Sequence, residues 1–161
     1  MLRTLSAGIS QSWISQQIQD HVWVVPAVQS IHILAIASLV FASFSANVAI
    51  LRGAGEAGDR PWLAGSYRWT WTALAVLLVS GTILLTGEPT RSIMNVFFRV
   101  KIVLVIVCAL LTLVLQRAVT GPERPRLTRG TLTTLAALSV LLWVAILFCG
   151  RFIAYFGDLA G

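Results

Sequence analysis

Four ionisable side chains lie beside or within apolar segments of the chain, and these residues could do chemistry. His32 lies about ten residues into a long apolar run, which as a helix rising about 1.5 Å per residue places it near the middle of a bilayer. Lys101 and Arg151 lie near the ends of two other apolar runs, and Glu88 follows a further one. Ionisable groups are costly in lipid and usually face a protein interior in pairs. We therefore expect one polar cluster in the outer half of a helix bundle.

His32 suits more than one kind of chemistry. Its imidazole could be an axial ligand of a b-type haem, or it could hydrogen-bond a quinone and exchange a proton with it. A small residue at a similar depth would leave space for a flat ring, and aromatic side chains would line the pocket. The residues assigned to this cofactor site are His32, Gln29, Gly81, Trp143, Arg151 and Tyr155.

The haem alternative lacks an obvious second ligand. His21, the other histidine, lies on the same predicted helix, about 16 Å further along its axis, so the two cannot clamp one iron. The second ligand would have to be Met94 or a histidine of a partner subunit. His32 is thus the candidate metal ligand. The chain lacks the series of methionines expected of a copper path, since Met1 and Met94 are the only two.

A charge cluster is expected next to His32. Glu88 is the natural counter-charge for Arg151 or Lys101, with Asp20 and Asp158 as competitors. The alternative is purely structural: an ion pair could join two helix ends, while Arg99 and Lys101 extend to the lipid headgroups. The predicted charge cluster comprises Glu88, Arg99, Lys101 and Arg151.

The elements that must position these residues are transmembrane helices. Of 161 residues, 57% are apolar and 11% charged, and the mean hydropathy is +0.85, which excludes a soluble globule. The formal charge of +6 comes from basic residues at the ends of apolar runs, so nucleic acid is not an expected partner. Cys108 and Cys149 lie in apolar runs without a CxxC spacing, and we interpret them as small buried apolar residues. We predict an all-α, single-domain integral membrane four-helix bundle over residues 1–161, with crossings at about 22–51, 69–87, 96–116 and 131–156.

The N-terminal segment has the pattern of an amphipathic helix. Apolar residues recur every three or four positions at Leu2, Leu5, Ile9, Trp13, Ile14 and Ile18. We predict an interfacial helix lying on the bilayer. The alternative is a packed terminal helix that covers the mouth of the bundle.

The basic residues also indicate an orientation. Two of the predicted connections carry Arg52, Arg60, Arg68, Arg117, Arg124, Arg126 and Arg129, whereas the opposite side carries Arg3, Arg91, Arg99, Lys101 and Arg151. The positive-inside rule then predicts that both termini lie outside the cytoplasm. In a bacterium they would be periplasmic, and the protein would be a multi-pass protein of the inner membrane.

Four stretches of the chain carry a family resemblance: residues 23–34, 80–88, 98–101 and 141–155. They resemble an uncharacterised family of small bacterial four-helix inner-membrane proteins, a domain of unknown function. More remotely, the chain is similar to the membrane domain of copper-resistance D proteins and to cytochrome-b-type anchors, which would imply a redox or copper-linked role. Gln116 stands where members of the family often have a histidine, which weakens the haem alternative.

These features predict a non-catalytic subunit of a respiratory or electron-transport assembly, with a quinone- or haem-contacting site around His32. Its partners would be the lipid bilayer and a larger membrane or periplasmic protein, or further copies of the same chain. One alternative is a structural or assembly subunit that docks a partner protein. Another is a translocator of a small solute, a metal or protons, although no internal repeat supports it.

Overall fold

The computed structural model describes residues 11–21, 23–53, 60–87, 89, 95–121 and 127–156. These residues form an all-α structure with the helices α2 (Trp13–Asp20), α3 (Val24–Leu51), α4 (Arg60–Gly87), α6 (Val96–Thr120) and α7 (Arg129–Phe156). All but α2 are long and apolar enough to cross a membrane. The predicted all-α class is confirmed, and the four long apolar helices agree with the predicted membrane crossings.

Two of the four long helices differ in extent from the predicted crossings. α4 begins at Arg60 and not near residue 69, and α6 continues to Thr120 and not to residue 116. Pro61 suits the first turn of a helix, where its missing N–H has no partner to lose. Hydropathy locates the part of a helix that lies in lipid, but a helix satisfies its own backbone and can continue into polar surroundings. The predicted bounds therefore mark apolar segments and not the helix ends.

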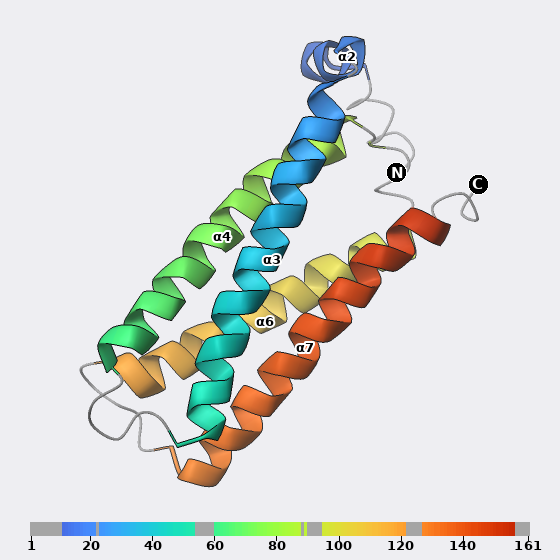
Figure 1. The fold of residues 1–161 in the computed structure, drawn as a ribbon. Helices are drawn as coiled ribbons and strands as arrows, with labels where there is room; N and C mark the ends of the chain where they lie inside the picture. The colour runs from blue at the N-terminus through green and yellow to red at the C-terminus, as the bar shows by residue number, and fades with distance from the viewer. Residues whose placement is uncertain are drawn as a thin grey trace.

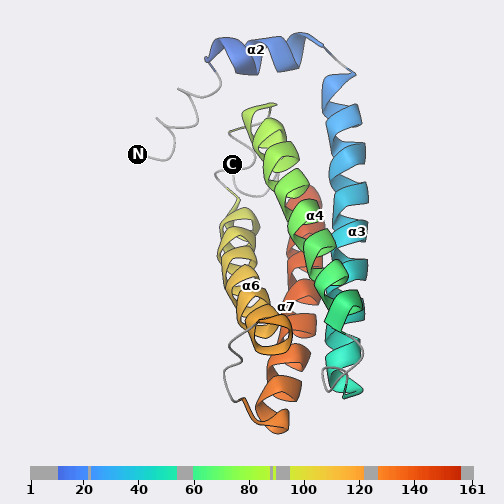
Figure 2. The same cartoon turned by 90° about the vertical axis from the view of Figure 1, so that its left-hand side faces the viewer.

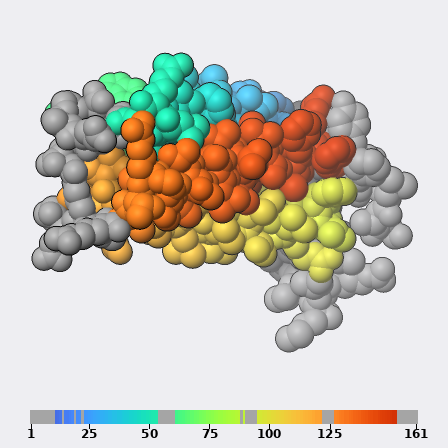
Figure 3. Space-filling view, turned by 90° about the horizontal axis from the view of Figure 1, so that it is seen from below, coloured from blue at the N-terminus to red at the C-terminus, as the bar shows by residue number. Residues whose placement is uncertain are grey.

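The long helices form two pairs, α3 with α4 and α6 with α7. Contacts between α3 and α7 join the two pairs. Figure 3 shows α7 between α6 and α3 on one face of the molecule. In Figures 1 and 2, α3 and α4 extend beyond α6 and α7 toward α2. We call the end with α2 the outer end, following the predicted orientation, and the opposite end the inner end.

Helix α2 lies across the outer end of α4 (Figure 2). The Ser15 hydroxyl donates a 2.7 Å hydrogen bond to the Thr86 carbonyl, one of the last carbonyls of α4, which lack a partner within their own helix. The Ile18 side chain packs over Gly87, while Trp13 is 73% exposed. These contacts favour the packed alternative for α2 itself. Residues 2, 5 and 9 of the predicted amphipathic face lie outside the described residues, so the interfacial helix stays a prediction.

At the inner end, an arginine side chain of α7 packs against the glycine that follows α3. Gly53 has a φ of 92°, a conformation that side chains other than hydrogen disfavour. A β-carbon at this position would lie 2.9 Å from an Nη atom of Arg129, the first residue of α7. The guanidinium thus lies by the C-terminus of α3, where the helix dipole favours a positive charge. This contact helps to hold α7 against α3.

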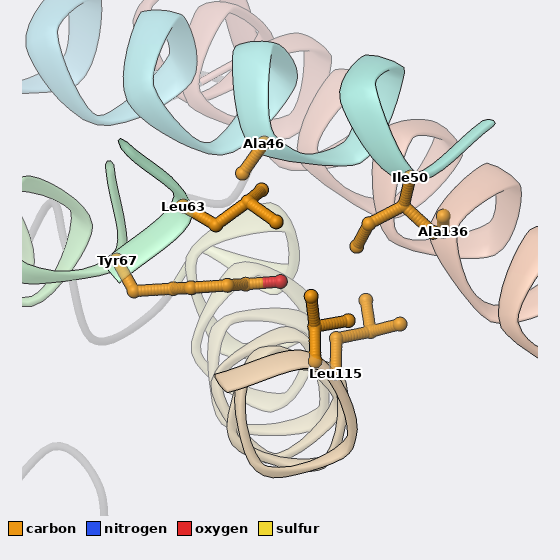
Figure 4. Close-up of a cluster of buried hydrophobic side chains, with 7 residues drawn as sticks. Ala46, Ile50, Leu63, Tyr67, Leu115 and Ala136 are labelled. Carbon is orange, nitrogen blue, oxygen red and sulfur yellow. The ribbon is translucent and has the colours of Figure 1, made fainter. Parts of the chain in front are cut away.

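Two apolar clusters form the core. The inner cluster comprises Ala46, Ile50, Leu63, Tyr67, Leu115, Val119 and Ala136, and Figure 4 shows Tyr67 reaching from α4 across it toward Leu115. The middle cluster comprises Leu39, Ala73, Leu74, Cys108, Trp143 and Ile146. Both clusters draw residues from all four long helices, so the inner and middle parts of the bundle form one packed core.

Candidate functional site

The imidazole of His32 is held in the interface between α3 and α4. Its Nδ1 lies 2.7 Å from the Ser80 hydroxyl oxygen, and that hydroxyl also donates a 2.7 Å hydrogen bond to the Val76 carbonyl one turn earlier. A serine hydroxyl has a single hydrogen. Because it goes to Val76, Ser80 accepts from His32, and Nδ1 carries the imidazole hydrogen. Nε2 is then the lone-pair nitrogen of the neutral ring, and no hydrogen bond to it occurs among the described residues.

The space at Gly81, predicted to admit a flat ligand ring, lies next to the imidazole of His32 itself. A β-carbon at position 81 would lie 3.4 Å from Cε1 of His32, closer than most such contacts. The ring therefore lies almost against the backbone of α4. Ser80 and Gly81 together fix the orientation of the imidazole, one by a hydrogen bond and the other by close approach.

Lys101 faces the same region from the other helix pair. It is the only lysine of the chain and is partly buried on α6. Its ammonium nitrogen lies 3.5 Å from the place of a β-carbon on Gly150, so the side chain rests against α7. Lys101 and His32 thus both lie in the outer half of the bundle, each against the second helix of its own pair.

The other predicted site residues are placed differently. Gln29 is exposed, and Ser80 takes the hydrogen bond to His32 that the spacing assigned to Gln29. Trp143 is a buried member of the middle apolar cluster. Glu88 and Met94 lie outside the described residues, as does the side chain of Tyr155.

The two arginines of the predicted charge cluster lie at its edge. Arg99 and Arg151 are both exposed. Near them the rings of Phe97 and Phe152 stack with centroids 5.5 Å apart, which ties the outer ends of α6 and α7 together. Glu88 lies outside the described residues, so the charge cluster stays a prediction.

Sequence reasoning missed Ser80 and Cys149 as parts of the site. A serine in a transmembrane segment usually bonds its own helix, as Thr82 does with the Leu78 carbonyl. The sequence does not indicate whether Ser80 or Thr82 bonds the histidine, because this depends on the rotation of α4 toward α3. Cys149, expected to be buried, is half-buried beside Lys101, whereas Cys108 is fully buried as predicted.

A second polar group lies toward the inner end. The Asn47 amide donates to the Ser139 hydroxyl at 3.0 Å, linking α3 to α7, and the Trp71 indole donates to the Gln116 amide oxygen at 2.7 Å, linking α4 to α6. None of these hydrogen bonds was predicted from the sequence. An amide within an apolar run could have indicated that Asn47 has a hydrogen-bond partner on another helix. These groups are satisfied by one another, which is typical of polar side chains that join helices in lipid.

The middle apolar cluster separates the two polar groups. On each long helix its members lie between the outer and the inner polar residues: Leu39 lies between His32 and Asn47, and Trp143 between Cys149 and Ser139. An ion or proton crossing the bundle would have to pass this apolar layer, where an unpaired charge is costly. The described residues therefore offer a site in the outer half and not a continuous polar path.

Comparison with known proteins adds no relative. No family model, curated protein or solved structure matches the chain. The family resemblance given by the motifs therefore stays a prediction, and the chemistry of the site has to be inferred from the residues themselves.

Proposed function

We propose that the protein is a small membrane subunit of a redox assembly that binds the headgroup of a quinol in the outer half of its bundle. The observation that carries this proposal is the fixed imidazole of His32. With Nδ1–H donating to Ser80, Nε2 is free to accept a hydrogen bond from a ring hydroxyl. The same nitrogen can accept the hydroxyl proton when the quinol is oxidised.

The surroundings of His32 agree with such a ligand. A quinol headgroup carries two oxygens on opposite sides of a flat ring, so it needs two polar partners that face each other. Lys101, on the opposite helix pair, can donate a hydrogen bond to the second oxygen. Val100, Ile102 and Val103 are exposed around it on α6, and these apolar side chains suit contact with a lipid-like tail.

Oxidation of a quinol also requires an electron acceptor, which we assign to a partner protein in the same membrane. The role of this chain is then to bind the ring and take up its proton. The predicted bacterial inner membrane, with the outer half on the periplasmic side, agrees with such an assembly.

A b-type haem is the second candidate, because an imidazole whose Nδ1–H is anchored is also typical of a metal ligand. Its predicted second ligand, Met94, lies outside the described residues. His21 is exposed at the junction of α2 and α3, with its Nδ1 2.9 Å from the Gln17 carbonyl oxygen. The quinol is favoured because Lys101 supplies a polar partner opposite His32 that a haem iron would not use.

The test is the quinone content of the purified protein. We expect wild-type protein in nanodiscs to retain quinone after extraction and mass spectrometry, and His32→Ala to retain about tenfold less, because one buried hydrogen bond is lost. Ser80→Ala should lose part of the quinone because the ring is no longer oriented. Thr82→Ala is the matched control, since Thr82 bonds only its own helix and is exposed.

Equal quinone content in wild type and folded His32→Ala would contradict the proposal. A haem absorption band in the purified protein that disappears in His32→Ala would favour the second candidate. Helical content by circular dichroism confirms that each variant is folded.

A further inference from the structure

The inner end of the bundle carries more positive charge than its own carboxylates can neutralise. The segments 52–68 and 117–129, which include both connections at this end, contain seven arginines and three carboxylates, Glu56, Asp59 and Glu123. At least four positive charges therefore remain, whichever arginines these carboxylates pair with. Basic segments of this kind are attracted to anionic lipid headgroups at the membrane surface.

Two of these arginines flank a hydrogen bond between α4 and α6. The Trp71 indole donates to the Gln116 amide oxygen at 2.7 Å, and Figure 1 shows the inner ends of the two helices close together. Arg68 lies about one turn from Trp71 toward the inner end, and Arg117 directly follows Gln116. Both arginine side chains are exposed. The hydrogen bond therefore holds two arginine-bearing turns against each other.

The two arginines also face the same side of this contact. Viewed along the chain, Arg68 is turned about 60° from Trp71 around the axis of α4. In the same rotational sense, Arg117 is turned about 100° from Gln116 around the axis of α6. Because α4 and α6 run in opposite directions, these rotations bring both side chains to one side of the contact. Both guanidinium groups thus face lipid on one surface, and arginine binds phosphate oxygens through paired hydrogen bonds.

Apolar side chains continue from these arginines toward the middle of the bilayer. Trp69, next to Arg68, is exposed, and indoles are typical of the level of the lipid headgroups. Val79 lies about three turns further along α4 on the same side as Arg68, and it is exposed. On α6, Leu110 is exposed about two turns from Arg117 in the same direction. Each helix thus presents a cation near the headgroups and an apolar surface beyond it, which matches a phospholipid with two acyl chains.

We propose that this surface, formed by Arg68 and Val79 of α4 and by Leu110 and Arg117 of α6, binds an anionic phospholipid in preference to a zwitterionic one. The lipid belongs to the leaflet at the inner end. Its phosphate accepts hydrogen bonds from the two guanidinium groups, and its acyl chains lie along α4 and α6. A headgroup with a net negative charge offsets the excess positive charge of this end, whereas a headgroup with its own ammonium does not. The surface lies in the opposite half of the bundle from His32, so this inference does not depend on the proposed function.

Native mass spectrometry of the full chain measures this preference. The protein would be released from nanodiscs with equal amounts of phosphatidylglycerol, which is anionic, and phosphatidylcholine, which is zwitterionic, both with the same acyl chains. We expect wild-type protein to retain phosphatidylglycerol about twentyfold more often, because each arginine near an anionic headgroup contributes about fivefold. Arg68→Gln and Arg117→Gln should each lower the ratio about fivefold, and the double variant should bring it close to one.

Arg52→Gln is the matched control. Arg52 is an exposed arginine of the same end of the bundle, but it follows α3 and lies away from the contact between α4 and α6. This variant loses the same charge and should keep the wild-type ratio. An equal loss in Arg52→Gln would show that the basic end attracts anionic lipid as a whole, and it would overturn the assignment to this surface.

The remaining outcomes are also decisive. A ratio close to one in wild-type protein overturns the preference for an anionic lipid. Lysophosphatidylglycerol has the same headgroup and a single acyl chain, so wild-type protein should retain it several-fold less often than phosphatidylglycerol. Equal retention of the two overturns the binding of two chains along α4 and α6. The quinone content of folded Arg68→Gln and Arg117→Gln should equal that of wild type, which separates failure of this inference from failure of the proposed function.

Discussion

The inner and outer halves of this bundle are built on opposite principles. In the inner half, side chains from all four long helices pack into a cluster in which Leu63, Leu115 and Ala136 are almost completely buried. In the outer half, the first buried residue of α3 is Ala35 and the first of α6 is Cys108. The outer turns of both helices are therefore loosely covered, and this is where His32 and Lys101 lie. The inner end of the bundle thus holds the helices together, whereas the described residues of the outer end are less covered by one another.

Two hydrogen-bonded pairs follow the same division, although the buried Tyr67 hydroxyl of the inner cluster has no partner among the described residues. Asn47 and Ser139 bond each other in the inner half, and Trp71 bonds Gln116. In the outer half, Nε2 of His32 and the Lys101 ammonium keep unused capacity within the described residues. Polar groups that hydrogen-bond each other contribute to folding, whereas polar groups with unused donors or acceptors can hydrogen-bond a ligand.

Truncation of Leu115 should give the largest effect and tests the structural half of the comparison. Leu115 is 1% exposed, and Leu115→Ala leaves a cavity in the inner cluster. We expect a loss of about 2 kcal/mol of unfolding free energy. This is at the low end for such changes, because a leucine side chain that leaves the core of a membrane protein enters lipid and not water. Detergent-induced unfolding followed by circular dichroism measures it.

The control for this variant lies on the same helix. Leu110 is 58% exposed, so Leu110→Ala should change the unfolding free energy by less than about 0.5 kcal/mol. Equal losses at the two positions would mean that the inner cluster is not the packed core of the bundle.

Removal of the Tyr67 hydroxyl should have a smaller effect, in the opposite direction. Tyr67 is 2% exposed, and its hydroxyl has no hydrogen-bond partner among the described residues. A buried polar group without a partner costs about 1–3 kcal/mol. Tyr67→Phe should therefore raise the unfolding free energy by about 1 kcal/mol in the same measurement. A loss of stability would instead show that the hydroxyl has a partner, such as a bound water molecule.

Addition of a methyl group at Gly81 should have the smallest effect on stability, yet it tests the binding half of the comparison. The new β-carbon would lie 3.4 Å from Cε1 of His32, so the ring must shift by a few tenths of an ångström and its bond to Ser80 is strained. We expect the unfolding free energy to change by less than about 0.5 kcal/mol, because alanine also favours the helix. The quinone content of the purified protein should nevertheless fall.

Gly65 provides the matched control on the same helix. A β-carbon at position 65 would meet no atom within 4 Å, so Gly65→Ala should leave the quinone content unchanged and raise the unfolding free energy by up to about 1 kcal/mol through the helix preference of alanine. If Gly81→Ala also retains the wild-type quinone content, the close approach of His32 to α4 is not important for the ligand.

The sequence predicted much of the fold but only part of the site. Long apolar runs gave the four membrane helices, because a helix is the structure that satisfies its backbone in lipid. The spacing of apolar residues could not give the helix ends at Arg60 and Thr120, since these lie beyond the apolar segments. His32 and Lys101 could be chosen from the sequence because ionisable residues are costly in such runs, and both lie in the outer half of the bundle.

The sequence did not predict which side chains contact the site residues. Gln29 was the reasonable choice for His32 by spacing along one helix, yet the structure pairs His32 with Ser80 on α4. Trp143 was chosen as a pocket residue for its ring, but it faces the core. A single helix has several polar or aromatic residues that would suit a site, and the sequence does not say which of them face a neighbour.

The sequence by itself determined the surroundings and the costly residues: four membrane-crossing helices, a histidine and a lysine placed in apolar segments, and arginines at the ends. The physical reason is that lipid penalises every unsatisfied polar group wherever the helix packs. Only the tertiary structure decided which nitrogen of His32 is free, and that α2 bonds the end of α4. Those outcomes depend on the rotation and crossing of helices, which short-range contacts between particular side chains fix after the helices have formed.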